Sequence, residues 1–328
     1  MHKSPLFSSL AVSTLVLACV LATHAGGQGP APAQPVPKPA PGQKVVGFSQ
    51  TGAESDWRVA NTTAMREEAK HRGYDLRLLD AQSKSDKQIF DVRALIAQKV
   101  DLIVISPLMT DPAEWQPVLT AAKEAGIPVI IQDRRINVPT EFYHAFIGSD
   151  FCEEGRQAAR WLAQKTNGHA AIFQLLGEPT SAPADERQRG FEEILKDYPG
   201  MEILKSQTAN FRRATGREVM AAFLQSPAGK ECTAVFAHND DMALGAIAAI
   251  EAAGKKPGID ILIVSIDAIK DALQAAADGK LNCTVECNPN TAPQIFDAID
   301  IYFHRPVPTR EAVIDQSQAR ALLPTRQY

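Results

Sequence analysis

Polar and aromatic side chains of a few kinds recur after the short apolar segments of this sequence. Carboxylates accept hydrogen bonds, Arg forks donate them and amides do both, so together they can satisfy hydroxyl groups, which are donors and acceptors at once. A flat aromatic ring can cover the apolar C–H face of a sugar. The set therefore favours a neutral polyol as ligand. The candidate binding residues are Glu54, Trp57, Arg58, Asp133, Arg134, Arg187, Phe211, Asn239 and Asp267.

Helix capping is the alternative explanation for a polar residue that follows a strand. Asp and Asn are among the preferred N-cap residues, and we interpret Asp111 and Asp240 as caps and nothing more. Six strand ends that all carry such groups are much harder to explain by capping. The pattern therefore favours a binding site assembled from several strand ends.

Other charged residues near these segments have simpler explanations. We expect Arg135, Arg212 and Arg213 to be solvated surface charges. His238 is interpreted as an oriented surface residue or as a support for a neighbouring binding group. The alternative for Arg58 is that it opens a helix and points to solvent. Because the helix dipole disfavours a cation at that end, we expect a compensating contact for Arg58.

The sequence lacks the common signatures of catalysis and cofactor binding. No Gly-x-Gly-x-x-Gly follows a strand, and neither a Walker loop nor a Gly-x-Ser-x-Gly elbow occurs. The His residues have no metal-ligand spacing. Asp133 and Asp267 could form a glycosidase pair, but Arg134 beside Asp133 favours hydrogen bonding over acid catalysis. We therefore expect a binding protein without metal or cofactor, and not an enzyme.

The elements that must position these residues alternate between strands and helices from Lys44 onward. Strands that are apolar throughout and separated by helices indicate parallel sheets covered on both faces. Nine such units predict two doubly wound α/β lobes, with ligands beyond the carboxyl ends of the strands. Ser85 and Gln88 have the spacing of a capping box. Strands are predicted at 45–48, 75–79, 102–105, 127–131, 170–176, 202–206, 234–237, 261–266 and 281–285, with helices between them and a last helix at 293–302.

The N-terminal segment has the pattern of an export signal. A short polar start precedes an apolar run at 10–22 that is too short to span a bilayer, and small residues follow. We predict a signal peptide at 1–25 and an extended Pro/Ala/Gly-rich linker at 26–43. The stretch 16–19 loosely resembles a lipoprotein cleavage box, so lipidation of Cys19 stays open.

Composition limits the choice of partners. The 328 residues suit two domains, and a net charge of −4 with a pI near 6.0 gives no basic surface for nucleic acid. Cys152, Cys232, Cys283 and Cys287 have no metal spacing. In a regular strand Cys283 and Cys287 would lie about 13 Å apart, too far for a disulfide. Whether any pair forms a bridge stays open.

Four stretches carry a family resemblance. They are 46–50, 101–107, 127–134 and 237–246, and they resemble the ribose/galactose-type periplasmic binding proteins of ABC transporters. Within this family, 52–58 and 238–242 are similar to the galactofuranose-binding members. The resemblance implies a periplasmic, monomeric component that closes about a hinge over a monosaccharide such as galactofuranose. Its implied partners are a membrane permease and that permease's ATPase.

The resemblance also implies how the two lobes are built. Three crossovers are expected near Gly148, Cys287 and Ser317. The N-terminal lobe would comprise 44–148 plus 288–316, and the C-terminal lobe 149–287 plus 317–328.

Roles for the candidate residues follow from the same resemblance. Asp133 and Arg134 would bind the ring and anomeric oxygens. Asn239 and Asp267 would bind hydroxyls from the other lobe. The rings of Trp57 and Phe211 would sandwich the sugar, while Glu54, Arg58 and Arg187 complete the set.

Two departures from the ribose type put a ribose ligand in doubt. Ribose-type members carry Arg where Asp185 stands and Gln where Cys287 stands, and Glu286 is only a weak substitute. Two other functional classes share the fold. A sugar-responsive repressor would need an N-terminal helix-turn-helix, which does not fit this sequence. An exported sensor that signals to a membrane kinase or chemoreceptor stays open.

Overall fold

The structure is a computed structural model that describes residues 39–304, all within one compact unit. The predicted signal peptide at 1–25, Cys19 and most of the linker lie outside the described residues. The same holds for the crossover expected near Ser317, for 305–316 and for 317–328. Within the described range, none of the helices is long and apolar enough to cross a membrane.

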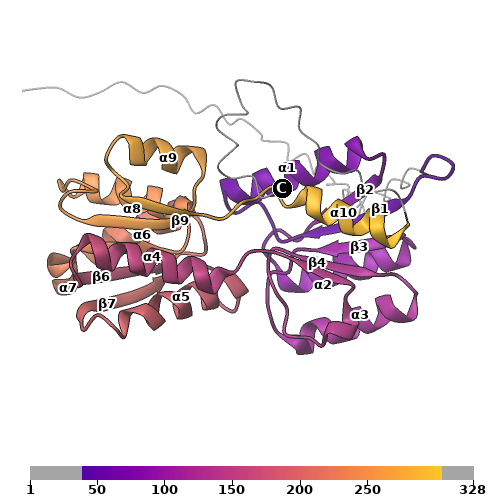
Figure 1. Cartoon of the computed structure of the whole chain (residues 1–328), viewed down its shortest axis with the longest axis horizontal. Coiled ribbons are helices and arrows are strands. Elements are labelled where there is room, and N and C mark those ends of the chain that lie inside the picture. Colours follow the sequence, from indigo (N-terminus) through magenta and orange to yellow (C-terminus); the bar gives the residue numbers. More distant parts are fainter. Residues whose placement is uncertain (1–38, 305–328) are drawn as a thin grey trace, which may run out of the picture. The chain divides into compact units, whose positions relative to one another are not determined.

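The first lobe is a parallel sheet covered on both faces (Figure 1). Neighbouring residues of β1 face opposite sides, as in any strand: Val45 packs with α2 and α3, and Val46 with α1 and α10. The strand order is β2-β1-β3-β4-β5. The strands are β1 (Val45–Gln50), β2 (Asp75–Asp80), β3 (Leu102–Ile105), β4 (Val129–Gln132) and β5 (Ala145–Ile147); the helices are α1 (Asp56–His71), α2 (Ser85–Ala97), α3 (Pro112–Glu124), η1 (Thr140–Phe142) and α10 (Ala292–Tyr302).

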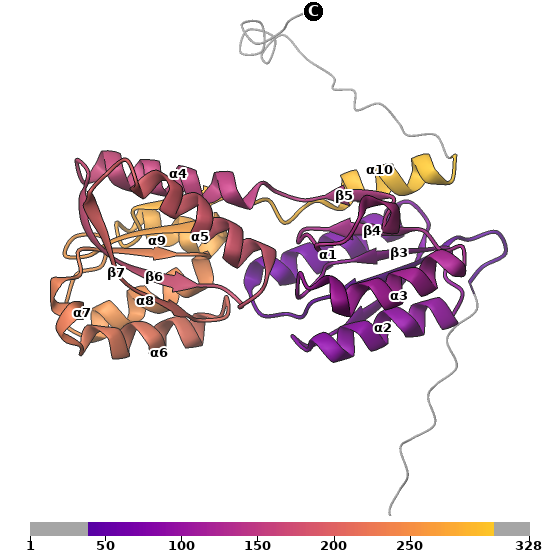
Figure 2. The same ribbon diagram turned by 90° about the horizontal axis from the view of Figure 1, so that it is seen from below.

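The second lobe repeats this plan with strand order β10-β9-β8-β6-β7. One core cluster joins α4 and α5 to the sheet, and another joins α6 and α8 to its other face. Figure 2 shows α4 and α6 on opposite sides of these strands. The strands are β6 (His169–Leu176), β7 (Gly200–Thr208), β8 (Ala234–Ala237), β9 (Leu262–Asp267) and β10 (Cys283–Glu286); the helices are α4 (Phe151–Lys165), α5 (Ala182–Leu195), α6 (Arg213–Leu224), α7 (Pro227–Glu231), α8 (Asp240–Ala252) and α9 (Lys270–Ala277).

The predicted fold class of two doubly wound parallel lobes is confirmed. Three short elements were not predicted: β5, η1 and α7, each of three to five residues. Segments of this length are too short for hydrophobic periodicity to reveal them. The four cysteines that the structure describes are free thiols.

One helix start differs from the prediction. Lys84, not Ser85, is the N-cap of α2, and the predicted capping box does not form. Gln88 instead turns inward, donates to the carbonyl of Ser106 at 2.7 Å and accepts from the amide of Leu108 at 2.8 Å. The side chain of Gln88 therefore makes a tertiary contact and does not cap the helix.

Asp111 is confirmed as a cap, whereas the interpretation of Asp240 as a cap is wrong. Asp111 accepts from the amide of Ala113, but Asn239 is the N-cap of α8. Asp240 is buried and accepts from Ser265, from Thr284 at 2.8 Å and from the amide of Ile269 at 2.8 Å. Asp240 therefore ties α8 to β9 and β10.

The described chain crosses between the lobes after β5 and again after β10. The first crossover passes Gly148, where a Cβ would lie 2.5 Å from the carbonyl oxygen of Asp133. The second passes Cys287 and leads to α10, which packs on α1 and β5 of the first lobe. Both lie where they were expected, and the residue limits of the two lobes stay a prediction.

Candidate ligand-binding site

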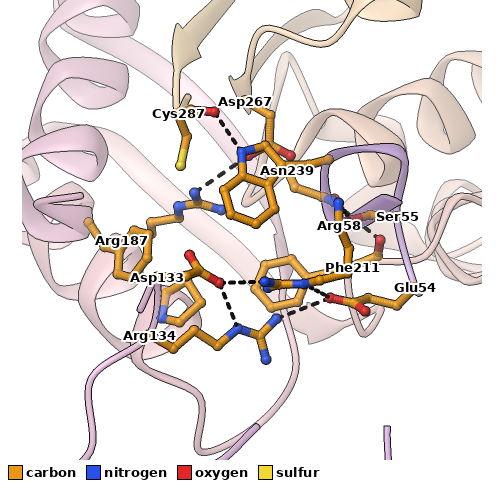
Figure 3. Close-up of a pocket in the computed structure, with 13 residues that line it drawn as sticks. Glu54, Ser55, Arg58, Asp133, Arg134, Arg187, Phe211, Asn239, Asp267 and Cys287 are labelled. Carbon is orange, nitrogen blue, oxygen red and sulfur yellow. Dashed lines mark hydrogen bonds and ion pairs between the residues drawn. The ribbon is translucent and has the colours of Figure 1, made fainter. Parts of the chain in front are cut away.

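One pocket lies at the carboxyl ends of both sheets (Figure 3). All nine predicted residues line it, so the strand ends of the two lobes converge on a single space. The lining also includes Ser55, Phe151, Pro183 and Cys287, which were not among the predicted binding residues.

Arg58 is the centre of the first lobe's contribution. Its Nη1 lies 2.7 Å from Asp133 Oδ2 and donates to Ser106 Oγ at 3.0 Å, and its Nε donates to Glu54 Oε1 at 3.1 Å. The guanidinium also stacks on the ring of Trp57, 4.7 Å from its centroid. Because the side chain is only 3% exposed, the alternative in which Arg58 points to solvent is wrong.

Glu54 and Arg134 interact electrostatically with the ion pair between Arg58 and Asp133. Burial alone would raise the pKa of Glu54, but the charges of Arg58 and Arg134 lower it. Burial and the nearby charge of Arg58 lower the pKa of Arg134 to about 10. Arg134 Nη2 lies 3.3 Å from Glu54 Oε1. The charged side chains on this side of the pocket therefore hold one another in place by ion pairs.

Three buried polar atoms of the first lobe's side of the pocket have no hydrogen-bond partner among the described residues. They are Arg134 Nε, Arg134 Nη1 and Glu54 Oε2. Buried polar groups in proteins are nearly always partnered. These two donor atoms and one acceptor are therefore suited to a polar ligand in the pocket.

Arg187 organises the second lobe's side of the pocket. Its Nε lies 2.9 Å from Glu154 Oε2, its Nη1 donates to the carbonyl of His238 at 2.5 Å, and its Nη2 lies 3.5 Å from Asp267 Oδ1. Burial raises the pKa of Asp267 well above its usual value, against the lowering effect of Arg187. Every nitrogen of Arg187 is thus engaged by the protein itself.

His238 is fully buried, so the surface interpretation is wrong. One ring nitrogen lies 3.1 Å from Gln174 Nε2, and the other accepts from the amide of Gly177 at 3.4 Å. Burial lowers its pKa well below the usual range, so the ring is neutral. Its carbonyl, rather than its ring, supports the site through Arg187.

Asn239 combines a structural and a site role. Its Oδ1 caps α8 by accepting from the amide of Met242, while its Nδ2 donates to the carbonyl of Phe211 at 3.2 Å.

Phe211, Asp133 and Asp267 have φ values of +58°, +62° and +131°. Such backbone conformations cost about 1–3 kcal/mol each and cluster at functional sites.

The lobes touch beside the pocket. Trp57 Nε1 donates to the carbonyl of Cys287 at 2.6 Å, and the amide of Asp56 donates to Asp241 Oδ2 at 2.9 Å. Arg213 lies 3.0 Å from Asp56 and 2.9 Å from Asp241. The expectation that Arg213 is a solvated surface charge is therefore wrong, because its guanidinium forms these ion pairs. Arg135 and Arg212 are exposed, as expected.

The missed lining residues differ in how well the sequence could reveal them. Cys287 directly follows β10, which is the same signal that identified the other candidates. Ser55 is the N-cap of α1, Phe151 begins α4 and Pro183 lies in the first turn of α5. No strand end points to the last two. Glu286, the weak substitute, is exposed and does not line the pocket.

A family profile described as "Periplasmic binding protein domain" matches residues 46–296. The chain belongs to the periplasmic binding protein family. This family consists of binding proteins that serve transport and is not an enzyme family, and it implies a periplasmic location.

Three relatives of this periplasmic binding protein are informative. The galactofuranose-binding protein YtfQ of Escherichia coli strain K12 is 43% identical over 260 residues, covering 78% of this chain and 81% of YtfQ. The solved binding component of the arabinose ABC transporter from Shewanella sp. ANA-3, bound to α- and β-L-arabinofuranose, is 44% identical with a TM-score of 0.78; the coverage is 87% and 96%. A Mycobacterium smegmatis protein solved with β-D-fucofuranose is 46% identical with a TM-score of 0.77; the coverage is 87% and 95%.

Gly177 determines where the ring of Phe211 lies. A Cβ on Gly177 would fall 1.9 Å from Phe211 Cζ, so Gly177→Ala must displace the ring. We expect this substitution to lower the free energy of unfolding by about 1–3 kcal/mol, as overpacking does. Urea unfolding measures the loss, with Lys205→Ala at an exposed position of the neighbouring strand β7 as control. In a Phe211→Ala background the loss should largely vanish, and an equal loss there would contradict the assignment.

Proposed function

We propose that this chain is the sugar-binding component of an ABC transporter and that it closes about its hinge over one monosaccharide, a furanose. The observation that carries the proposal is the buried pocket in which Glu54 and Arg134 leave polar atoms unpartnered while both lobes contribute polar and aromatic groups. The three relatives support the furanose, because their names or structures refer to galactofuranose, arabinofuranose and fucofuranose.

The polar groups of the two lobes bind different oxygen atoms of the sugar. Asp133 and Arg134 bind the ring and anomeric oxygens from the first lobe. Asn239 and Asp267 bind hydroxyls from the second lobe. Arg187 orients Asp267, which fits the engagement of all its nitrogens by protein groups.

The two aromatic residues and the loop after β1 explain why the site prefers a sugar with a five-membered ring. Trp57 and Phe211 both line the pocket, and the indole N–H of Trp57 is already used by Cys287. The flat ring of a furanose lies between their two faces. Glu54 and Arg58 are the partners for the exocyclic hydroxyls of a hexofuranose.

Transport requires partners in the membrane. The monomeric, exported chain delivers its sugar to a permease that is driven by an ATPase, after removal of a signal peptide at 1–25. The alternative, an exported sensor of a membrane kinase or chemoreceptor, is less favoured because the relative from Shewanella is a transporter component.

Asp133 is the most direct test of the site. Asp133→Ala removes an acceptor and leaves Glu54 alone to match the charges of Arg58 and Arg134, which should weaken sugar binding by about 2–5 kcal/mol. Titration calorimetry measures the affinity, and circular dichroism checks that the variant is folded. Asp111→Ala, which removes a helix cap outside the pocket, is the matched control and should bind as the wild type does. Wild-type affinity in Asp133→Ala would show that this carboxylate does not contact the sugar.

Arg58 tests the preference for a hexofuranose. Arg58→Ala should weaken galactofuranose by about 1.5–3 kcal/mol, the range for a charge-assisted hydrogen bond. Arabinofuranose lacks one exocyclic carbon, so it should lose only what breaking the Arg58–Asp133 pair costs both sugars, and therefore less than galactofuranose loses. Competition titrations of both sugars give the comparison, and Arg66→Ala on the exposed face of α1 is the control. Equal losses for the two sugars would defeat the assignment of Arg58.

A further inference from the structure

The site buries more carboxyl groups than guanidinium groups. Seven ionisable side chains in and directly behind the pocket are each less than a tenth exposed. If all were ionised, one negative charge would be left over, and an unmatched buried charge is costly. His238 is neutral, and a sugar brings no charge. The seven residues are Arg58, Arg134, Arg187, Glu54, Asp133, Glu154 and Asp267.

The excess lies on the second lobe. In the first lobe Arg58 and Arg134 are matched by Glu54 and Asp133. In the second lobe Arg187 alone stands between two carboxyls. Its Nε lies 2.9 Å from Glu154 Oε2, and its Nη2 lies 3.5 Å from Asp267 Oδ1.

Glu154 lies behind the pocket and does not line it. It reaches Arg187 because α4 and α5 approach closely at two glycines: a Cβ on Gly155 would lie 2.2 Å from the carbonyl oxygen of Arg187, and one on Gly190 would lie 1.9 Å from that of Cys152. The second oxygen of Glu154, Oε1, is buried and has no hydrogen-bond partner among the described residues. Its negative charge is compensated by Arg187 and, to a smaller extent, by the thiol of Cys287.

We propose that Glu154 is a positioning residue that shares Arg187 with Asp267, so that this carboxyl pair holds one proton when the site closes over its sugar. The proposal rests on the proposed function. Glu154 acts through Arg187 and Asp267 and does not touch the sugar.

The groups that face the pair add no second cation. Glu154 faces Arg187 from α5, Cys287 after β10 and Asp133 after β4. Asp267, at the end of β9, interacts with Glu154 as well. Asp267 also faces two residues of α8, Asp240 and Asp241. Asp241 is paired with Arg213, whereas Asp240 is held by hydroxyls and an amide. Of the groups facing the pair, only Arg187 is cationic.

The electrostatic shifts agree with this geometry. Burial raises the pKa of Glu154 and of Asp267, and the charge of Arg187 opposes both shifts. Asp267 lines the pocket to which both lobes contribute, whereas Glu154 is buried between two helices of one lobe. Closure therefore removes the Asp267 carboxyl from water, and the closed pair binds more protons than the open one. Sugar affinity should therefore increase as the pH falls from the closed-state pKa towards the open-state pKa, by about tenfold per pH unit for one proton.

Calorimetry in buffers of different ionisation enthalpy counts the protons taken up. Wild-type protein titrated with galactofuranose near pH 6.5, about two units above an ordinary carboxyl pKa, should take up about one proton per sugar. Glu154→Gln keeps an acceptor for Arg187 but removes one charge. It should bind the sugar with almost no proton uptake and with an affinity that no longer rises as the pH falls.

Two further variants separate this role from a structural one. Glu153→Gln, at the partly exposed neighbour that pairs with Arg156 and Arg160, should keep the wild-type proton uptake. Asp267→Asn should bind more weakly and lose the uptake. Equal uptake in wild type and Glu154→Gln, or none in the wild type while sugar binds, would overturn the proposal. If wild type binds no sugar, the proposed function itself fails and this inference fails with it.

Discussion

The buried ion pair between Arg58 and Asp133, 2.7 Å apart, is the interaction on which the site depends. It joins the start of α1 to the end of β4 and fixes a cation that has lost nearly all contact with water. Glu54 matches the same cation and extends the network to Arg134. Because these groups hold one another in place, the pocket's polar atoms are oriented before a ligand arrives. Such preorganisation reduces the ordering cost of binding.

The fold provides two sheet edges at which polar side chains can gather. In each parallel sheet the strands end at one edge, and the two edges contribute to a single pocket. The cost of the arrangement is visible in the backbone, where Asp133, Phe211 and Asp267 all adopt positive φ. Close packing at Gly177 and Gly155 then places a ring and a guanidinium where larger residues would not permit them. Backbone and side chains together thus shape the site.

Much of this could be predicted from the sequence, because strand ends are local features. The apolar strands predicted the two sheets, and the polar and aromatic residues that follow them, together with the family resemblance, predicted nine residues of the pocket lining. What failed depended on partners distant in the sequence. Asp240 has the position of a cap, but its partners Thr284 and Ile269 come from elsewhere. Glu154 lies within a helix, and only the close approach of α4 and α5 brings it to Arg187.

Titration calorimetry of the wild-type chain with galactofuranose, galactopyranose and ribose tests the central claim most directly. The account predicts that galactofuranose binds most tightly, with a dissociation constant of about 1 μM or lower, and is recovered unchanged. At a free concentration of about 100 times that constant it should stabilise the fold by about 2.7 kcal/mol. Tighter binding of ribose or galactopyranose would contradict the furanose assignment. Binding of none of the three, or chemical alteration of the bound sugar, would contradict the account of the pocket as a sugar-binding site.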